Sequence, residues 1–347
     1  FDIRKTIFTG KTKGFVAYPR TETMKHMLHS NLGLTFSRQQ KAAGFRHAFV
    51  VQHILESGFL SSVTSEWSYL APLYFYNNSP QSSLLDTKNS AHELNISPDF
   101  IKALSEKLGL EFEQNLQQRI QKENEESEHD ETAGRGKKYS NIRWDEYAHT
   151  KREGERVVKS RPSDDYFGPE DIFYYAYAIF HSPTYRSRYA EQLKIDFPRL
   201  PLTDDKKLFA QLVRFGNELV NLHLLGENPF DKSKTVFDEP EKWSVKISGA
   251  KPENLADWKV AEVRYNEKDK RVYVNKGQCF EGVEKEVWEF MIGGYQVCEK
   301  WLKDRKKAER SLSTDDLKHY MKIVVAIRET IRLMADIDYT IRKWPIE

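Results

Sequence analysis

The stretch that decides the fold covers residues 169–202 and reads PEDIFYYAYAIFHSPTYRSRYAEQLKIDFPRLPL. Its first half predicts a helix, because a proline followed by two acids suits the first turn and the positive end of the helix dipole. Ile172 and Ile179 then fall on one apolar face at helical spacing. Pro183 disfavours helix in the residue before it, so we expect a break there, followed by a second helical piece over 184–193.

The part of the chain before this stretch is predicted to be rich in strands. Short runs of β-branched and aromatic residues, separated by Gly, Asn and Pro, are typical of strands and turns. One helix is expected over 21–30, with Thr21 as its N-cap. Another is bounded by Ser97 and Gly109. The predicted strand runs are 5–10, 13–18, 46–60 and 68–78.

The part after this stretch is predicted to be mainly helical. Residues 203–225 form an amphipathic pattern that Thr203 caps, and the last helix begins at Ser313 with Asp316 in a position typical of a capping box. Six positions of that last helix follow a seam close to a heptad, which favours a helical bundle. They are Leu317, Met321, Val324, Arg328, Ile331 and Ala335.

Between these helices the sequence returns to strands. Alternating apolar and polar residues predict a hairpin over 258–275. The run 286–294 is ambiguous between strand and helix, and we interpret it as a strand because the pair Gly293-Gly294 ends it. A further helix is expected over 295–306.

These patterns predict an α+β protein in two regions. Residues 1–202 form a β-rich region with covering helices, and 203–347 form a helical, partly bundled region with a small β-hairpin portion at 240–292. The highly charged run 119–165 contains few residues that could build a core, so we interpret it as an exposed insertion. Its GRGKK sequence leaves open a basic arm that contacts nucleic acid.

The bulk composition is that of a soluble protein that forms a core, with 39% hydrophobic and 31% charged residues. The net charge is only +2, from 54 basic and 52 acidic residues. This balance weakens the hypothesis that the protein binds nucleic acid without excluding it. Cys279 and Cys298 form no metal or disulfide framework, and no apolar run is long enough to span a membrane. We therefore expect a cytoplasmic protein, and Phe1 in first place indicates a fragment or a processed piece.

Several catalytic motifs are absent from the sequence. It has no glycine-rich phosphate loop, no Gly-x-Ser-x-Gly elbow and no paired histidines at metal-ligand spacing. The Asn/Asp-Pro-Pro-Tyr/Phe loop of adenine-methylating enzymes is also missing. The run DEPEKWSVK at 238–246 contains the residue types of a nuclease site, but such sets arise often by chance in a charged chain.

The stretch 169–202, followed by LFAQLVRFGNELVNLHLL, resembles the C-terminal specificity domain of Type ISP restriction-modification enzymes. Further agreement comes from the beginning of the chain, from NLGLTFSRQ and PLYFY, and from the last two predicted helices. The resemblance therefore spans nearly the whole chain, and the charged insertion 119–165 is the main departure from it.

The resemblance implies a DNA target-recognition module without catalytic activity of its own. Members of that family are long prokaryotic polypeptides that carry a nuclease, an ATP-driven translocase, an N6-adenine methyltransferase and finally this domain. Double-stranded DNA and the upstream modules are thus the implied partners, with no membrane. No cofactor is implied for this chain; S-adenosylmethionine, ATP and magnesium are implied for the parent.

Residues suited to reading DNA gather in the run SRQQKAAGFRHAF at 37–49. Arginine suits guanine edges and glutamine suits adenine, each through two hydrogen bonds, while Lys and Arg also neutralise phosphates. The candidates in this run are Arg38, Gln39, Gln40, Lys41, Arg46 and His47. A polar hairpin tip without such a role is the competing interpretation.

Other candidates lie in four further segments. Lys11 and Lys13 suit phosphate contact or an exposed turn, and Arg20 suits DNA contact or a buried ion pair. Arg186 and Arg188 follow the Pro183 break, where structural anchoring is favoured over DNA contact. Gln296 and Lys300 are weaker candidates at a helix start that could bind a phosphate. A docking or scaffold domain that uses the aromatic residues and the last helix, and an unrecognised nuclease, remain the alternative functions.

Overall fold

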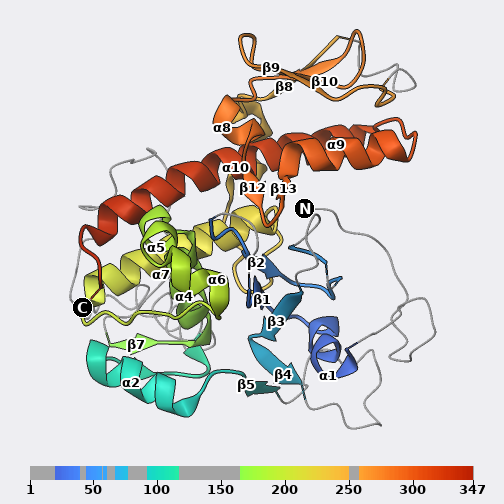
Figure 1. Cartoon of the computed structure of the whole chain (residues 1–347). Coiled ribbons are helices and arrows are strands. Elements are labelled where there is room, and N and C mark those ends of the chain that lie inside the picture. The colour runs from blue at the N-terminus through green and yellow to red at the C-terminus, as the bar shows by residue number, and fades with distance from the viewer. Residues whose placement is uncertain are drawn as a thin grey trace, which may run out of the picture.

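The computed structural model describes residues 20–39, 44–56, 58–60, 67–76, 92–116, 165–249 and 258–346. Helices and small sheets are mixed within it, and the described strand pairs are antiparallel except for Glu111–Phe112 with Tyr166–Phe167; the α+β prediction is confirmed (Figure 1). The predicted strands at 5–10 and 13–18 and nearly all of the predicted insertion 119–165 lie outside the described residues.

The N-terminal region contains a three-stranded antiparallel sheet of order β2-β1-β3. Phe36 of β1 lies opposite Ala48 of β2 and Tyr69 of β3, which fixes the register of the sheet. The elements of this region are α1 (Thr21–Met24), η1 (Lys25–Leu28), β1 (Gly33–Ser37), β2 (Ala48–Val51), β3 (Ser68–Pro72), β4 (Tyr74–Tyr76), β5 (His92–Leu94), α2 (Pro98–Leu108) and β6 (Glu111–Phe112).

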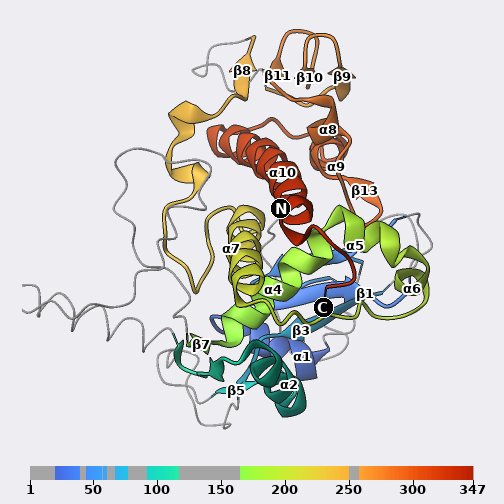
Figure 2. The same cartoon turned by 90° about the vertical axis from the view of Figure 1, so that its left-hand side faces the viewer.

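The central layer is a pair of packed helices, α4 and α7, which Figure 2 shows beside the sheet and below α10. The predicted break at Pro183 is confirmed, because α4 ends at His181 and a new helix begins at Pro183. The elements of this layer are β7 (Tyr166–Phe167), α4 (Pro169–His181), α5 (Pro183–Arg188), α6 (Ala190–Ile195) and α7 (Lys206–His223).

The C-terminal region adds two long helices and a four-stranded antiparallel sheet of order β8-β11-β10-β9. In Figure 1 this sheet lies at the end of the molecule opposite α2. The elements are η3 (Val236–Asp238), η4 (Pro240–Lys242), β8 (Lys246–Ser248), β9 (Arg264–Asn266), β10 (Arg271–Tyr273), β11 (Cys279–Glu281), α8 (Lys285–Trp288), β12 (Met291–Ile292), β13 (Tyr295–Gln296), α9 (Val297–Lys307) and α10 (Thr314–Ile341).

The division of the chain at residue 202 stays a prediction. The two helices on either side of it, α4 and α7, pack closely against each other, and the buried apolar side chains of both regions form one continuous cluster. The predicted boundary therefore falls between elements that share a core.

Several local predictions were wrong. The N-cap of α1 is Arg20 and not the predicted Thr21, and the helix expected over 21–30 is divided into α1 and η1. The side chain of Asp205, not that of Thr203, caps α7, because the Asp205 carboxylate reaches the amides of Lys207 and Leu208 at 2.8 and 3.1 Å. The run 286–294 begins inside α8, where tertiary packing buries Val287 and Trp288, and only its end forms β12.

The predicted heptad seam of α10 was also displaced. Arg328 extends away from the helix and binds the Glu284 carboxylate and the Gly282 carbonyl through Nη2, both at 2.6 Å, and Ala335 is exposed. The core instead receives an apolar face at spacings of three and four residues that contacts α7, α4 and α9. Its positions include Tyr320, Ile323, Ile327, Leu333, Ile337 and Ile341.

The close approach of α4 and α7 depends on Gly216. A Cβ added at this position would lie 1.8 Å from the carbonyl oxygen of Tyr174, a backbone atom that cannot move aside. Almost all of α4 is buried around this contact, including Tyr174, Tyr175 and Tyr177. The two helices can therefore pack at this distance only while residue 216 has no side chain.

A chain of buried hydrogen bonds links β2 to these helices. The amide of Val50 donates to the Tyr177 hydroxyl (3.2 Å), which lies 2.5 Å from Nδ1 of His223. Nε2 of His223 lies 3.0 Å from Oγ1 of Thr330 on α10, whose own hydroxyl donates to the Ala326 carbonyl. Thr330 donates its hydroxyl proton to that carbonyl, so toward His223 its oxygen can only accept. His223 therefore donates through Nε2 and accepts the Tyr177 proton at Nδ1.

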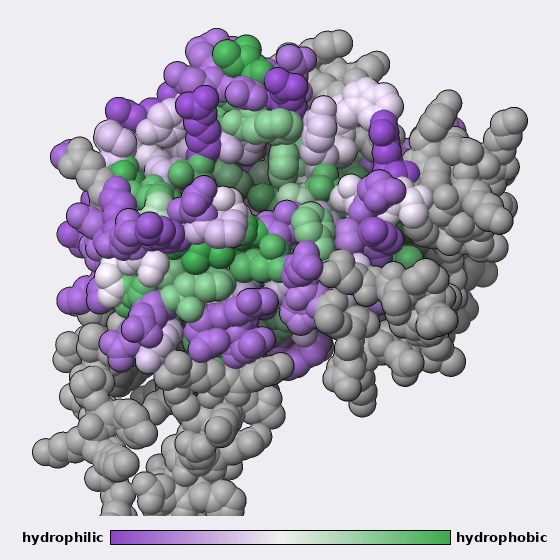
Figure 3. Space-filling view, turned by 90° about the horizontal axis from the view of Figure 1, so that it is seen from below, coloured by the Kyte–Doolittle hydropathy of each residue, from purple (hydrophilic) through white to green (hydrophobic). Residues whose placement is uncertain are grey.

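Below α2 and β5 lies the lower face of the molecule. Figure 3 shows apolar residues near the middle of this face with hydrophilic residues around them. Among the described residues, no helix is both long and apolar enough to cross a bilayer.

The first prediction concerns Gly216. Gly216→Ala should lower the free energy of unfolding by about 3 kcal/mol or more, because the methyl group forces α4 and α7 apart. The measurement is urea unfolding followed by Trp fluorescence. Gly277→Ala is the matched control, since a Cβ at Gly277 meets nothing within 4 Å; equal stability of the two variants would contradict the prediction.

The second prediction concerns pH. Burial lowers the pKa of His223 from 6.5 to about 3, so the unfolded chain takes up a proton between these values and the folded chain does not. Stability should therefore fall on acidification, by about 2 kcal/mol between pH 7 and pH 5 from this residue.

The control is His223→Gln, which retains a donor and an acceptor but does not titrate. Urea unfolding at both pH values should give a smaller loss of stability on acidification in this variant than in the wild type. An equal loss in both proteins would assign the pH dependence to other groups.

Candidate nucleic-acid interface

One face of the β2-β1-β3 sheet carries exposed aromatic and basic side chains. Phe36 and Tyr69 are cross-strand partners on this face, and the same alternation continues to Arg38 just after β1 and Trp67 just before β3. Trp67 and Tyr69 are 59% and 45% exposed, although both are large aromatic residues. Single exposed apolar residues are common, but a cluster of them indicates an interaction surface.

The segment at the end of α6 completes this cluster. Ile195 and Phe197 are 69% and 38% exposed, and Figure 2 shows α6 beside β1. The Phe197 ring meets Phe36 and Tyr69 edge-on, with centroids 5.5 and 5.3 Å apart. We call the group the aromatic-arginine surface, and it consists of Arg20, Arg38, Trp67, Tyr69, Ile195 and Phe197.

Arginine side chains lie over the rings of this surface. The guanidinium carbon of Arg38 is 5.5 Å from the centroid of Phe197, and that of Arg20 is 5.7 Å from the centroid of Trp67. Both distances fall within the range of a cation-π attraction, which holds each guanidinium near the surface without removing it from solvent.

The two carboxylates of the α6 segment are neutralised by neighbouring cations. Asp196 lies 3.6 Å from Nε of Arg38, and Glu191 lies 2.6 Å from Nζ of Lys194. Such exposed pairs contribute little to stability, but they reduce the repulsion that free carboxylates would exert on an anionic partner.

Arg186 anchors α5 to the end of α4. Its Nε donates to the Phe180 carbonyl at 2.6 Å, and burial, with a smaller contribution from nearby Arg46, lowers its pKa from 12.5 to about 10. The group stays charged at neutral pH. The predicted preference for anchoring over DNA contact fits this geometry, whereas Arg188 at the end of α5 is exposed.

The start of α5 is held by the last helix. Asp338 of α10 accepts hydrogen bonds from the Thr184 amide at 2.9 Å and the Thr184 hydroxyl at 2.7 Å. The Ser182 hydroxyl donates to the other carboxylate oxygen. The chain at the Pro183 break is thus held in place by a residue of α10, far away in the sequence.

The hairpin between β12 and β13 docks on the backbone beside the surface. The Gly293 amide donates to the Arg46 carbonyl at 2.7 Å, and the Gly294 amide donates to the Leu60 carbonyl at 3.1 Å. Gly293 has φ 54°, and a Cβ there would lie 1.6 Å from the Leu60 carbonyl oxygen. Only glycine can occupy this position without displacing the hairpin.

The structure brings several of the predicted DNA-contacting residues together. Arg20, Arg38, Gln39 and Arg46 are exposed, and Arg46 lies within electrostatic range of Arg186. The candidates Lys11, Lys13, Gln40 and Lys41 lie outside the described residues.

Three other candidates are not freely presented. His47 is completely buried, so its imidazole is not at the surface. Gln296 is half-buried and its amide donates to the Trp288 carbonyl at 3.4 Å, and Lys300 is paired with Asp304 at 2.6 Å. Trp67, Tyr69, Ile195 and Phe197 were not among the predicted site residues, because an aromatic or aliphatic residue suits a core as well as a recognition surface.

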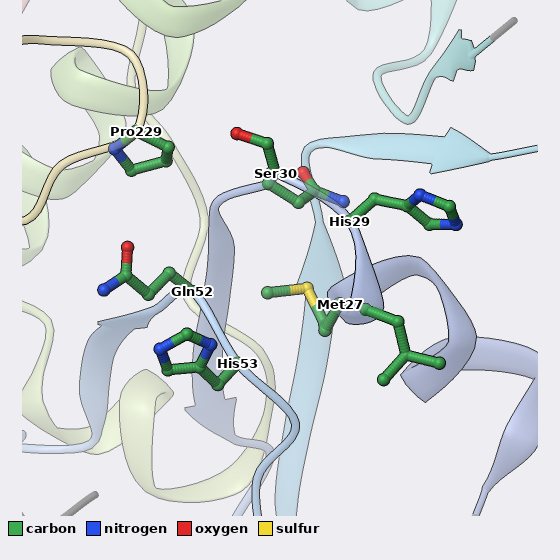
Figure 4. A pocket seen from close by; sticks show the side chains of 8 residues that line it. Met27, His29, Ser30, Gln52, His53 and Pro229 are labelled. Carbon is green, nitrogen blue, oxygen red and sulfur yellow. The ribbon is translucent and has the colours of Figure 1, made fainter. Parts of the chain in front are cut away.

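A pocket of about 290 Å³ lies between η1, the end of β2 and the loop after α7. Figure 4 shows His29, Gln52 and His53 among the side chains that line it. Its polar groups are two imidazoles, amides and a hydroxyl, with no carboxylate. Within the described residues, no group of three or more His, Cys, Asp or Glu side chains is placed to hold a metal.

The two cysteines are buried and free. Burial raises the pKa of Cys298 to about 12, so its thiol stays protonated and is a poor nucleophile. Burial also raises the pKa of Cys279. Neither residue is part of the aromatic-arginine surface.

The family model of the Type ISP C-terminal specificity domain matches residues 1–336. This chain belongs to that family. The resemblance found in the sequence is therefore confirmed. No curated protein gave a match to the sequence.

Solved structures with a similar fold come from much longer chains. The ATP-dependent Type ISP restriction-modification enzyme LlaBIII bound to DNA aligns over 94% of this chain, with a TM-score of 0.57 and 16% identity. The DrdV-DNA complex aligns over 94%, with a TM-score of 0.55 and 17% identity. A nuclease-deletion mutant of LlaGI with a DNA substrate mimic aligns over 91%, with a TM-score of 0.51 and 15% identity.

These likenesses define the fold of the specificity domain. The chain spans 17% of the LlaBIII chain, 26% of the DrdV chain and 22% of the LlaGI chain. An activity of those longer proteins can therefore be proposed only for a longer protein that contains this domain.

The third prediction tests the docking of the hairpin. Gly293→Ala should displace β12 and β13 from the Arg46 and Leu60 carbonyls and increase hydrogen exchange at the amides of residues 293 and 294. The free energy of unfolding should fall by about 2 kcal/mol. Unchanged exchange at both amides would contradict this role of Gly293.

Proposed function

We propose that this domain recognises a specific sequence in double-stranded DNA. In this proposal it directs the upstream N6-adenine methyltransferase and the ATP-dependent nuclease modules of a Type ISP parent. The chain itself has no catalytic role and needs no cofactor, while S-adenosylmethionine, ATP and magnesium serve the upstream modules. Its place of action is the prokaryotic cytoplasm.

The observation that carries the proposal is the gathering of exposed guanidinium and amide groups at one end of the β1-β2 strand pair. Arg38, Gln39 and Arg46 lie at the facing ends of β1 and β2. Guanidinium groups suit guanine edges and phosphates, and the amide of Gln39 suits adenine. Membership in the specificity-domain family and the DNA-bound state of the structures with similar folds support the same assignment.

The backbone around these groups supports their use for recognition. β1 is paired on both edges, and the carbonyl of Arg46 is bonded to the hairpin turn. Side chains on such a scaffold lose less freedom when they bind, which favours a specific contact over a diffuse one.

A protein-docking role is the second candidate. Exposed Trp, Tyr and Arg side chains are enriched at the centres of protein interfaces, and Trp67, Tyr69 and Arg38 fit that description. The apolar face of α10 is less suited to this role, because α7, α4 and α9 already contact this helix.

The fourth prediction separates the two candidates. Arg38→Ala and Arg46→Ala should each weaken binding to a duplex selected from a random pool by about tenfold, because each removes a contact to a base or a phosphate. Binding should also weaken steeply with salt, and each variant that loses a phosphate contact should reduce the salt slope by about one.

The matched control is Lys268→Ala. It removes the same charge from an exposed position between β9 and β10, at the end of the molecule opposite α2 (Figure 1). Its affinity should stay within about twofold of the wild type. Failure of the wild-type chain to bind any duplex at low ionic strength would exclude the proposed function.

A further inference from the structure

The end of α6 presents two apolar side chains to solvent. Ile195 is the last residue of this helix and is 69% exposed, the highest exposed fraction of the large apolar residues on the aromatic-arginine surface. Phe197 follows two residues later. Exposing the isoleucine side chain to water is unfavourable, so a partner that covers it gains binding free energy.

The segment that carries these side chains is held at both ends. Leu193 of α6 is buried, and the Tyr185 hydroxyl donates to the Arg199 carbonyl at 2.7 Å. Between these points the Phe197 ring is fixed by the edges of Phe36 and Tyr69. Ile195 is therefore exposed on a supported segment, beside the packed Phe197 ring.

Charge around this segment favours a polyanionic partner. Arg38 and Lys194 pair with Asp196 and Glu191, respectively. Further exposed cations are Arg46, Arg199 in the segment after α6, and Arg20, which lies over Trp67. An apolar protein surface would gain nothing from these charges, whereas a duplex would bring a phosphate to them.

We propose that Ile195, supported by the packed Phe197 ring, forms an apolar wedge that enters one base step of the bound duplex. The inference rests on the proposed DNA recognition and specifies how part of it works. Proteins that insert Ile or Phe between base pairs unstack the step and kink the duplex, with the neighbouring cations on the phosphates. The surface has both parts of that arrangement.

A wedge adds sequence preference without a hydrogen bond to a base. Unstacking costs a few kcal/mol per step, and the cost is lowest at flexible pyrimidine-purine steps. The domain would therefore favour such a step opposite Ile195, in addition to the bases that Arg38, Gln39 and Arg46 contact.

The fifth prediction uses the 347-residue chain and a duplex selected from a random pool, with 2-aminopurine placed at successive positions. Wild-type protein should raise the fluorescence at one step only, because unstacking relieves quenching there. Ile195→Ala should abolish that rise and weaken binding about fivefold to tenfold. A mismatch at the same step should tighten wild-type binding and have less effect on the variant.

Tyr339→Ala is the matched control, because Tyr339 is 77% exposed on α10 and belongs to no part of this surface. It should keep both the fluorescence rise and the affinity. The wedge is overturned by wild-type binding without a fluorescence rise at any position, or by identical behaviour of Ile195→Ala and Tyr339→Ala. Loss of binding to an isolated methyltransferase module in Ile195→Ala, with DNA binding intact, would assign the surface to protein docking instead.

These outcomes are distinct from failure of the proposed function. If DNA recognition is wrong, the wild-type chain and Lys268→Ala both fail to bind duplex. If only the wedge is wrong, Arg38→Ala still weakens binding to the duplex. The 2-aminopurine fluorescence is then the same with Ile195→Ala as with the wild type.

Discussion

The contact between α4 and α7 is the constraint on which the rest of the structure depends. Tyr174 presents its carbonyl oxygen to the one position of α7 that lacks a side chain, Gly216. The resulting short distance allows Tyr177 to reach both the Val50 amide on β2 and the imidazole of His223 on α7. The sheet that carries the aromatic-arginine surface is thereby fixed to the helical layer by apolar packing and by hydrogen bonds whose donors and acceptors are matched.

The candidate interface is assembled from segments that lie far apart in the sequence. The ends of β1 and β3 provide Arg38, Trp67 and Tyr69, and the end of α6 provides Ile195 and Phe197. Asp338, near the end of α10, holds the first turn of α5, from which the chain continues into α6. The last helix therefore supports a surface to which it contributes no side chain of its own.

Local signals in the sequence predicted much of the fold. Pro169, the break at Pro183 and the Ser313-Asp316 capping box gave the correct helix positions, because they act through neighbouring residues. Some of the wrong predictions arose where tertiary contacts decide, as with Trp288, which packs as part of a helix although its run suits a strand. For the interface, Arg38 and Arg46 were suggested by their chemistry, and the structure places both at the surface. Trp67 and Phe197 were missed because hydrophobicity indicates burial, and only the arrangement of the strands shows that this face is uncovered.

The β12-β13 hairpin hydrogen-bonds to main-chain carbonyls on the opposing segments. The Gly293 amide, the Gly294 amide and the Tyr295 hydroxyl donate to the carbonyls of Arg46, Leu60 and Phe59, respectively. Every residue type offers the same carbonyl. Amino acids at the ends of β1 and β2 can therefore be exchanged during evolution while this attachment persists, so that a new target site could arise by substitution on an unaltered framework.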